Sequence, residues 1–391
     1  KDRVLRHTVL LLFAGLHVAF GQSKIILSSR FFHPSNASDT LSTVSVIDQL
    51  KPDRLDWIYT VKPEQLQLYK DRNIAYSIAM NPPLPDSAGF TSIKTRIVDI
   101  NKRPYVAPWM KGWKINNPYW GCVNNPEFKK LFYKRALQIA DLGAYAIFVD
   151  DALFNVQLQK ENKYGCFCKY CLEGFTKYLL RHNHRGAFSP EKIVTEINAR
   201  QLSVTNRNLL NLYKKYQEES VVEFLNEWKK AVKEVKPQML FLTNNYKGQW
   251  NNIYRVFDGG IAELPEEKLN IEYLDSLYKL ADKFHKTQVF TLVSLKPEAQ
   301  DYLMAYCYLK GRDFLIPWDI FVPTNANASN RYYGNIANIK ELILLFKKRS
   351  LLIEVSNEPI SADKKNTYYK IERRNAINVF LLNKDPLKSE R

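Results

Sequence analysis

The chain has 391 residues, of which 46% are hydrophobic and 25% charged, and it contains only 14 glycines and 18 prolines. This composition excludes an intrinsically disordered protein, a collagen-like repeat and a small disulfide-stapled scaffold. The net charge of +17 indicates either an acidic partner, such as an anionic glycan or lipid, or a solvated lysine-rich surface. Nucleic acid is not expected, because the sequence has neither a dense basic tract nor a glycine-rich phosphate loop.

The N-terminal segment has the pattern of an export signal. Basic residues precede an apolar stretch over 8–20, and Ala19 and Gly21 provide the small residues of a cleavage site. We therefore expect 1–21 to be a signal peptide and the protein to be secreted or periplasmic. A buried first helix is the alternative, and no second segment is long and apolar enough to span a membrane.

Eight short apolar runs, rich in Ile, Val, Phe, Leu and Tyr, follow along the chain. Near-continuous apolar runs are typical of strands that are buried on both faces, as in a parallel sheet. The predicted strands are Lys24–Phe32, Leu55–Thr60, Ile74–Met80, Ala144–Val149, Met239–Thr243, Val256–Ala262, Val289–Leu295 and Phe314–Phe321.

Helical patterns separate most of these runs. Asn125 and Pro126 have the N-cap and first-turn signature of a helix that stops at Gly143. The first two connections show poor helix patterns. Further helices are predicted at Val204–Val235, Ile271–Phe284 and Ile339–Lys348.

Eight strands with crossover helices predict an α/β fold, a (β/α)₈ barrel over residues 22–350. An open doubly wound sheet is the alternative. The tail over 351–391 changes character, because Tyr368–Ile371 and Ala376–Leu382 have the pattern of strands. Since so few strands cannot form an independent domain, we expect this extension to dock on the barrel or to begin a β domain.

Four cysteines flank the fourth predicted strand. Cys122 precedes the helix that leads into this strand, and Cys166, Cys168 and Cys171 follow it. Neighbouring strand ends would bring the four thiols together, and four thiolates form the closed tetrahedral site typical of structural Zn²⁺. Two disulfides or unpaired thiols are the alternatives. Cys307 is expected to be a buried free thiol, and no organic cofactor is predicted.

Carboxylates follow predicted strands at the end of the barrel where active sites form. Asp150 and Asp151 end the fourth strand, and Glu263 ends the sixth. Glycosidic cleavage needs one carboxyl to protonate the leaving oxygen and another to act as nucleophile or general base. We assign these roles to Asp151 and Glu263. Asp150 is expected to support the site or bind a hydroxyl, because adjacent strand residues point in opposite directions.

Aromatic and polar side chains also cluster around the predicted strand ends. Aromatic planes pack against the apolar faces of sugar rings, while polar groups bind their hydroxyls. These side chains therefore predict a carbohydrate substrate. The candidate substrate-binding residues are Arg30, His33, Asn81, Trp109, Trp113, Asn244, Asn245, Tyr246, Trp250, Trp318 and Asp319.

Asp150-Asp151, followed by Cys166-Phe167-Cys168-Lys169-Tyr170-Cys171, resembles the fourth-strand region of glycoside hydrolase family 42 and its divergent (β/α)₈ relatives. The resemblance covers about 118–180 and implies a β-galactosidase-like catalytic barrel with zinc on the four cysteines. That family has Asn-Glu where Asp150-Asp151 stand, so Asp151 takes the place of the acid/base by position alone. The family's nucleophile on the seventh strand has no clear equivalent, and Glu263 is our substitute.

These patterns together predict a secreted glycoside hydrolase that cleaves a poly- or oligosaccharide. An anionic substrate is favoured only by the net charge. Two other functions are compatible with the sequence: a catalytically inactive glycan-binding barrel, and a metal-dependent carbohydrate deacetylase. The deacetylase is disfavoured because none of the six histidines forms a His-x-His pair at a strand end. The sequence leaves the oligomeric state open.

Overall fold

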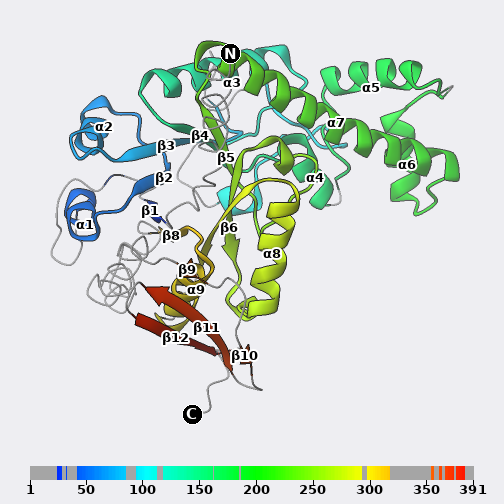
Figure 1. The fold of residues 1–391 in the computed structure, drawn as a ribbon. Coiled ribbons are helices and arrows are strands. Elements are labelled where there is room, and N and C mark those ends of the chain that lie inside the picture. The colour runs from blue at the N-terminus through cyan, green and yellow to red at the C-terminus, as the bar shows by residue number, and fades with distance from the viewer. Residues whose placement is uncertain are drawn as a thin grey trace, which may run out of the picture.

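A computed structural model describes residues 24–28, 32, 42–84, 94–111, 118–161, 163–184, 186–292, 297–317, 354–355, 361–362, 366–373 and 376–383. Eight parallel strands form a closed barrel in which each strand pairs with the next and β8 pairs with β1 (Figure 1). This confirms the (β/α)₈ barrel and excludes the open sheet. The strands are β1 (Ile25–Ser28), β2 (Arg54–Ile58), β3 (Ala75–Met80), β4 (Ala146–Val149), β5 (Leu240–Asn244), β6 (Gly259–Leu264), β7 (Thr287–Leu292) and β8 (Phe314–Pro317).

The barrel strands are apolar on both faces because both faces are covered. One set of side chains, including Ile26, Phe148 and Leu315, packs inside the barrel. The alternate set, including Ile147 and Phe290, packs against the surrounding helices. Successive strand residues point to opposite faces, so two apolar layers require the near-continuous hydrophobic runs found in the sequence.

Helices cover the outside of the barrel. The two poorly predicted connections each contain a short helix: Ser42 caps the first by accepting a hydrogen bond from the Ser45 amide at 3.1 Å, and Pro63 begins the second. The predicted helices at 126–141, 204–235 and 271–283 are confirmed, whereas 339–348 and the export segment 1–21 lie outside the described residues. The α-helices are α1 (Thr43–Leu50), α2 (Pro63–Lys70), α3 (Pro126–Asp141), α4 (Gln157–Lys160), α5 (Lys169–Arg181), α6 (Pro190–Asn198), α7 (Val204–Val235), α8 (Ile271–Lys283) and α9 (Pro297–Lys310).

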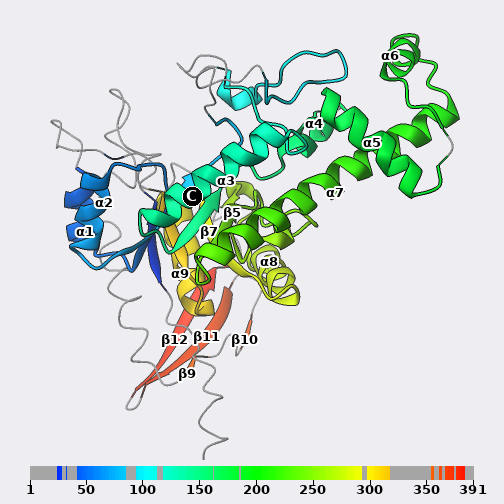
Figure 2. The same ribbon diagram turned by 90° about the horizontal axis from the view of Figure 1, so that it is seen from above.

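A large excursion follows β4. Figures 1 and 2 both show α5 and α6 at the outer end of α7, on the far side of the molecule from α1 and α2. This region has its own apolar cluster, which includes Trp120, Phe175 and Tyr213 and is separate from the barrel core. The excursion is therefore an internally packed extension that stands beside the carboxyl ends of the strands.

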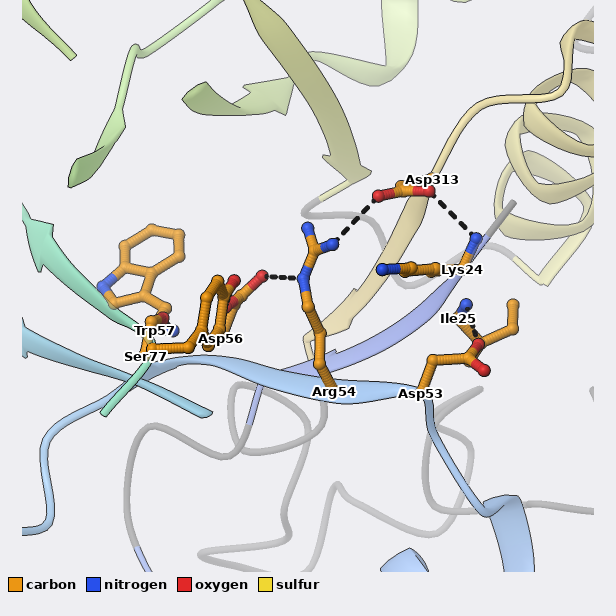
Figure 3. Close-up of polar contacts among 9 residues, drawn as sticks. Lys24, Ile25, Asp53, Arg54, Asp56, Trp57, Ser77 and Asp313 are labelled. Carbon is orange, nitrogen blue, oxygen red and sulfur yellow. Dashed lines mark hydrogen bonds and ion pairs between the residues drawn. The ribbon is translucent and has the colours of Figure 1, made fainter. Parts of the chain in front are cut away.

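A charged network lies at the amino ends of β1, β2 and β8 (Figure 3). The Arg54 guanidinium donates to Asp56 at 2.7 Å and to Asp313 at 3.1 Å. Tyr145 donates to the other oxygen of Asp56 at 2.5 Å, and the Lys24 amide donates to Asp313 at 2.9 Å. These contacts join the first, second and last strands, where the barrel closes. Asp56 therefore belongs to the end of the barrel opposite the predicted active site.

The C-terminal segment forms a small antiparallel sheet. It consists of β9 (Glu354–Val355), β10 (Ser361–Ala362), β11 (Asn366–Arg373) and β12 (Ala376–Asn383). Its two long strands coincide with the runs predicted in the tail, and β12 contacts α9 of the barrel. The predicted boundary at residue 350 lies outside the described residues. In the part of the chain that the structure describes, no helix has both the length and the apolar character of a membrane span.

Candidate active site

A pocket of about 580 Å³ opens at the carboxyl ends of the barrel strands. This volume lies within the usual range for small-molecule sites. The predicted residues among its lining are Asp150, Asp151, Glu263, Asn244, Tyr246 and Trp109. The lining residues that the sequence analysis did not single out are Trp57, Tyr59, Pro108, Leu153, Gln157, Lys160, Glu161 and Tyr254.

Asp150 and Asp151 both line the pocket, although they are adjacent in the sequence. We expected them to point in opposite directions. The strand ends at Val149, however, and Asp151 has a left-handed backbone conformation with φ of 56°. This conformation interrupts the strand alternation, so that the second carboxyl also faces the pocket. Non-glycine residues in this region are strained, and such strain is concentrated at functional sites.

Glu263 lies near the carboxyl end of β6 and lines the same pocket. The Asn244 side-chain amide donates a hydrogen bond to its Oε2 at 3.0 Å, and the Asn244 Oδ1 accepts one from the Tyr246 amide at 2.9 Å. Asn244 therefore orients the carboxylate and the loop that follows β5. Asn244 also lines the pocket, and its contact with a sugar hydroxyl stays a prediction.

The end of β2 contributes a hydroxyl group to the pocket. The Tyr59 hydroxyl donates to Asp150 Oδ2 at 2.7 Å, and the Trp57 indole N–H donates to the Tyr59 oxygen at 3.4 Å. The Trp57 ring stacks on Phe148 inside the barrel with 4.9 Å between centroids. The signal in the sequence that could have identified Tyr59 is its position at the end of the second predicted strand, Leu55–Thr60.

The wall formed by the excursion carries further charges. Tyr105 donates to Glu161 Oε1 at 2.5 Å, and Lys163 pairs with Glu161 Oε2 at 3.1 Å. Burial lowers the pKa of Lys160, and its attraction to Asp151 opposes this shift. Burial raises the pKa of Tyr105, and the neighbouring Glu161 and Asp151 raise it further because a phenolate would be repelled. Four carboxyls and one ammonium group thus line the pocket.

Two aromatic residues lie at the mouth of the pocket. Trp109 is 46% exposed and packs edge-on against the buried Trp120, with 6.0 Å between ring centroids. Tyr246 is 48% exposed, and the ammonium groups of Lys160 and Lys247 lie 5.0 and 5.5 Å from its ring centroid. Trp109 is therefore the better placed of the two to stack on a sugar ring, because two lysines already occupy the surroundings of Tyr246.

Three other predicted substrate-binding residues do not line the pocket. Asn245 is fully buried and bonds Gln288 at 2.8 Å, and Trp250 donates to the same Gln288 side chain at 2.9 Å. Both stabilise the loop beneath the pocket because their polar groups are satisfied internally. Asn81 follows β3 without reaching the lining. The remaining candidates lie outside the described residues: Arg30, His33, Trp113, Trp318 and Asp319.

The four predicted metal ligands meet in one cluster. The sulfur atoms of Cys122, Cys166, Cys168 and Cys171 all lie within 4.8 Å of one another. Cys122 is 3.4 Å from Cys171, 3.5 Å from Cys168 and 3.7 Å from Cys166. These separations far exceed a disulfide bond, and they match the spacing of about 3.8 Å that a tetrahedron with Zn–S bonds of about 2.3 Å requires.

The surroundings of the cluster also suit thiolates. The Asn155 side-chain amide lies 3.5 Å from both Cys122 and Cys171, and the Asn124 amide donates to Cys171 at 3.3 Å. N–H donors directed at sulfur favour the charged form of the ligand. Without a cation, burial raises the pKa of the Cys122 and Cys166 thiols, because a charged sulfur there is removed from water. A divalent cation would compensate for this cost.

No family model matches the sequence, and no curated protein matches it either. Several solved structures share its architecture. Eubacterium rectale Amy13B has a TM-score of 0.53 and 9% identity, over 95% of this chain and 88% of that one. The β-galactosidase from the psychrophilic Marinomonas ef1 has a TM-score of 0.54 and 8% identity, over 84% of this chain and 60% of the enzyme.

The cold-adapted β-galactosidase from Rahnella sp. R3 is similar to a comparable degree. Its TM-score is 0.51 and its identity 13%, over 78% of this chain and 52% of the enzyme. The chain thus spans little more than half of either β-galactosidase. At these identities the likeness concerns the fold alone. The chain therefore has a TIM-barrel fold that known glycoside hydrolases share.

Proposed function

We propose that the protein is a glycoside hydrolase that cleaves O-glycosidic bonds of a poly- or oligosaccharide with two carboxyl groups. The observation that carries the proposal is that Asp151, from the end of β4, and Glu263, from β6, line one pocket at the mouth of the barrel. Barrel enzymes place their catalytic groups at this end. The glycoside hydrolases among the fold neighbours add support at the level of the fold only.

The two carboxyls have different environments and different proposed roles. Asp151 donates its proton to the leaving oxygen of the glycosidic bond. Glu263 acts as nucleophile or general base at the anomeric carbon, held in place by the Asn244 amide. Trp109 offers its exposed ring to a sugar face, because an aromatic plane binds the apolar side of a pyranose.

We also propose that Cys122, Cys166, Cys168 and Cys171 hold a structural Zn²⁺. A zinc ion in such a site cross-links the protein and has no open position for a substrate. It would join the segment before α3 to the excursion after β4, and both border the wall that carries Trp109 and Glu161. The resemblance of this region to glycoside hydrolase family 42 is consistent with the zinc assignment. We further propose that residues 1–21 are an export signal and that the enzyme is secreted or periplasmic.

A reducing-sugar release screen tests the proposal. The purified protein is incubated with neutral and anionic polysaccharides beside two variants, Asp151→Asn and Glu263→Gln. Asp141→Asn is the matched control, because it makes the same chemical change at the end of α3, where the side chain is 74% exposed. Release that both pocket variants abolish and the control retains supports the proposal. Binding without release by any form would favour a non-catalytic glycan-binding barrel.

A further inference from the structure

We infer that Tyr59 is a positioning residue that keeps Asp150 ionised, and that the resulting negative charge keeps the proton on Asp151. The inference rests on the proposed glycosidase function, because it explains how one of two adjacent carboxyls acts as the acid. It begins with a backbone irregularity in β2, continues through a chain of hydrogen bonds, and ends at the pair of aspartates after β4.

The irregularity is a β-bulge. Leu55 of β2 pairs with Tyr76 of β3, and Ile58 pairs with Ile78. Between these two pairs β2 advances by three residues and β3 by only two. Trp57 lies within this bulge and has a left-handed backbone conformation with φ of 61°. Its amide donates a hydrogen bond to the Ser77 hydroxyl at 3.0 Å. A bulge redirects the side chains that follow it. Here it directs Tyr59 into the pocket, toward Asp150.

The hydrogen bonds that follow have a defined direction. The Trp57 indole can only donate, so the Tyr59 oxygen accepts from it and the Tyr59 hydroxyl donates to Asp150 Oδ2 at 2.7 Å. The Asp151 backbone amide donates to the other oxygen, Oδ1, at 3.0 Å. Both oxygens of Asp150 therefore accept hydrogen bonds. Two donors on one carboxyl favour its ionised form, because a charged carboxylate accepts these hydrogen bonds more strongly than a neutral carboxyl does.

The charge on Asp150 changes the protonation of Asp151. Two carboxyls that share a site do not both ionise readily, so a charge fixed on Asp150 favours the protonated form of its neighbour. Other groups act on the pair as well. Lys160 attracts a charged Asp151 and so opposes the effect of Asp150, although burial lowers the pKa of Lys160 itself. The groups that face the pair from the surrounding elements are Tyr59, Tyr105, Lys160, Glu161, Tyr246, Tyr254 and Glu263.

Because the pair holds one proton and Asp150 stays charged, the two carboxyls have separate roles. Asp151 carries the proton and transfers it to the glycosidic oxygen as the C–O bond breaks. The water that completes hydrolysis returns a proton to Asp151, so the step needs no other reactant. Asp150 retains its charge throughout. Tyr59 does not exchange a proton in this scheme; it fixes the position and charge of Asp150.

The test is the Tyr59→Phe variant, which removes the hydroxyl and keeps the ring. Its matched control is Tyr76→Phe, because Tyr76 also makes a 2.7 Å hydrogen bond, to the Leu142 carbonyl outside the pocket. A hydrogen bond to a carboxylate is worth roughly one pKa unit. In Tyr59→Phe the one proton of the pair spends part of its time on Asp150, so we expect the maximal kcat/KM to fall several-fold while the alkaline limb does not move to lower pH, with the profile of the control unchanged.

Carbon-13 NMR titration of the aspartate carboxyls provides a readout that does not depend on activity. Asp150→Asn and Asp151→Asn assign the pair, and the lower titration of the pair, that of Asp150, is expected to rise by about one unit in Tyr59→Phe because the charged carboxyl loses a donor. The inference is overturned if this titration stays within ~0.2 unit of its wild-type value and the maximal kcat/KM is unchanged, because ~0.2 unit is negligible against one hydrogen bond. If no glycan is hydrolysed but the titration moves, the proposed function fails while the role of Tyr59 stands.

Discussion

Replacement of Arg54 by methionine is expected to destabilise the barrel strongly. Asp56 is fully buried. It accepts a 2.7 Å hydrogen bond from Arg54 and a 2.5 Å hydrogen bond from Tyr145. Methionine preserves much of the length of the side chain but removes the charge that balances Asp56 and Asp313 (Figure 3). Among the described residues, the neutral Tyr145 hydroxyl then remains as the side-chain donor to the buried carboxylate.

The magnitude follows from burial. Loss of one partner of a buried ion pair costs about 3–5 kcal/mol, because the remaining charge is left uncompensated. The same substitution at Arg72 is the control. Arg72 pairs with Asp48 at 2.7 Å, but the two side chains are 28% and 53% exposed, so Arg72→Met should cost only about 0–1 kcal/mol. Comparison of the two variants therefore distinguishes the free-energy contribution of a buried ion pair from that of an exposed one.

Urea unfolding followed by tryptophan fluorescence gives the free energy of unfolding of each variant. We expect the Arg54→Met midpoint to fall well below those of the wild type and Arg72→Met, which should lie close together. A loss at Arg54 of less than about 1 kcal/mol, or equal losses at both positions, would refute the argument that the network holds the closure of the barrel.

Three further outcomes follow from the structure. If the four cysteines hold zinc as proposed, Cys171→Ser should lower the zinc content found by elemental analysis of the purified protein, and a zinc content equal to that of the wild type would contradict the assignment of the ligands. Gly121→Ala should cost about 1–3 kcal/mol in urea unfolding, because its new Cβ would lie 1.9 Å from the Phe128 ring, whereas Gly186→Ala, at 3.6 Å from its nearest neighbour, should cost much less. Burial raises the pKa of Cys307 to about 12, so its thiol is uncharged at pH 8. We therefore expect Cys307 to resist labelling by iodoacetamide until the protein unfolds. Rapid labelling of Cys307 in the native protein would contradict this expectation.

The strand order and most of the barrel could be predicted from the sequence, because a strand buried on both faces needs a run of apolar residues. The same logic predicted that Cys122 would approach Cys166, Cys168 and Cys171, since adjacent strand ends are neighbours in a barrel. The short helices α1 and α2 were missed because eight-residue helices provide too few turns for a clear periodicity.

The pocket was harder to predict in detail. Asp151 and Trp57 adopt left-handed backbone conformations that nothing in their residue types indicates, and these conformations decide which side chains enter the pocket. The inward positions of Asp151 and Tyr59 follow from them. Asn245 and Trp250 carry polar groups typical of a binding site, but Gln288 satisfies both groups beneath the pocket. Sequence alone does not distinguish a polar group that binds a ligand from one that binds a buried neighbour.

The central claim is that Glu263 takes part in glycosidic bond cleavage. The most direct measurement compares kcat and the Kd for an oligosaccharide in the wild type, in Glu263→Gln and in Glu267→Gln, an exposed control in the short 3₁₀ helix (Glu266–Lys268) that follows β6. We predict that Glu263→Gln lowers kcat at least about 1,000-fold, with a Kd close to that of the wild type, and that Glu267→Gln changes neither. A Glu263→Gln variant that keeps its kcat would contradict the account.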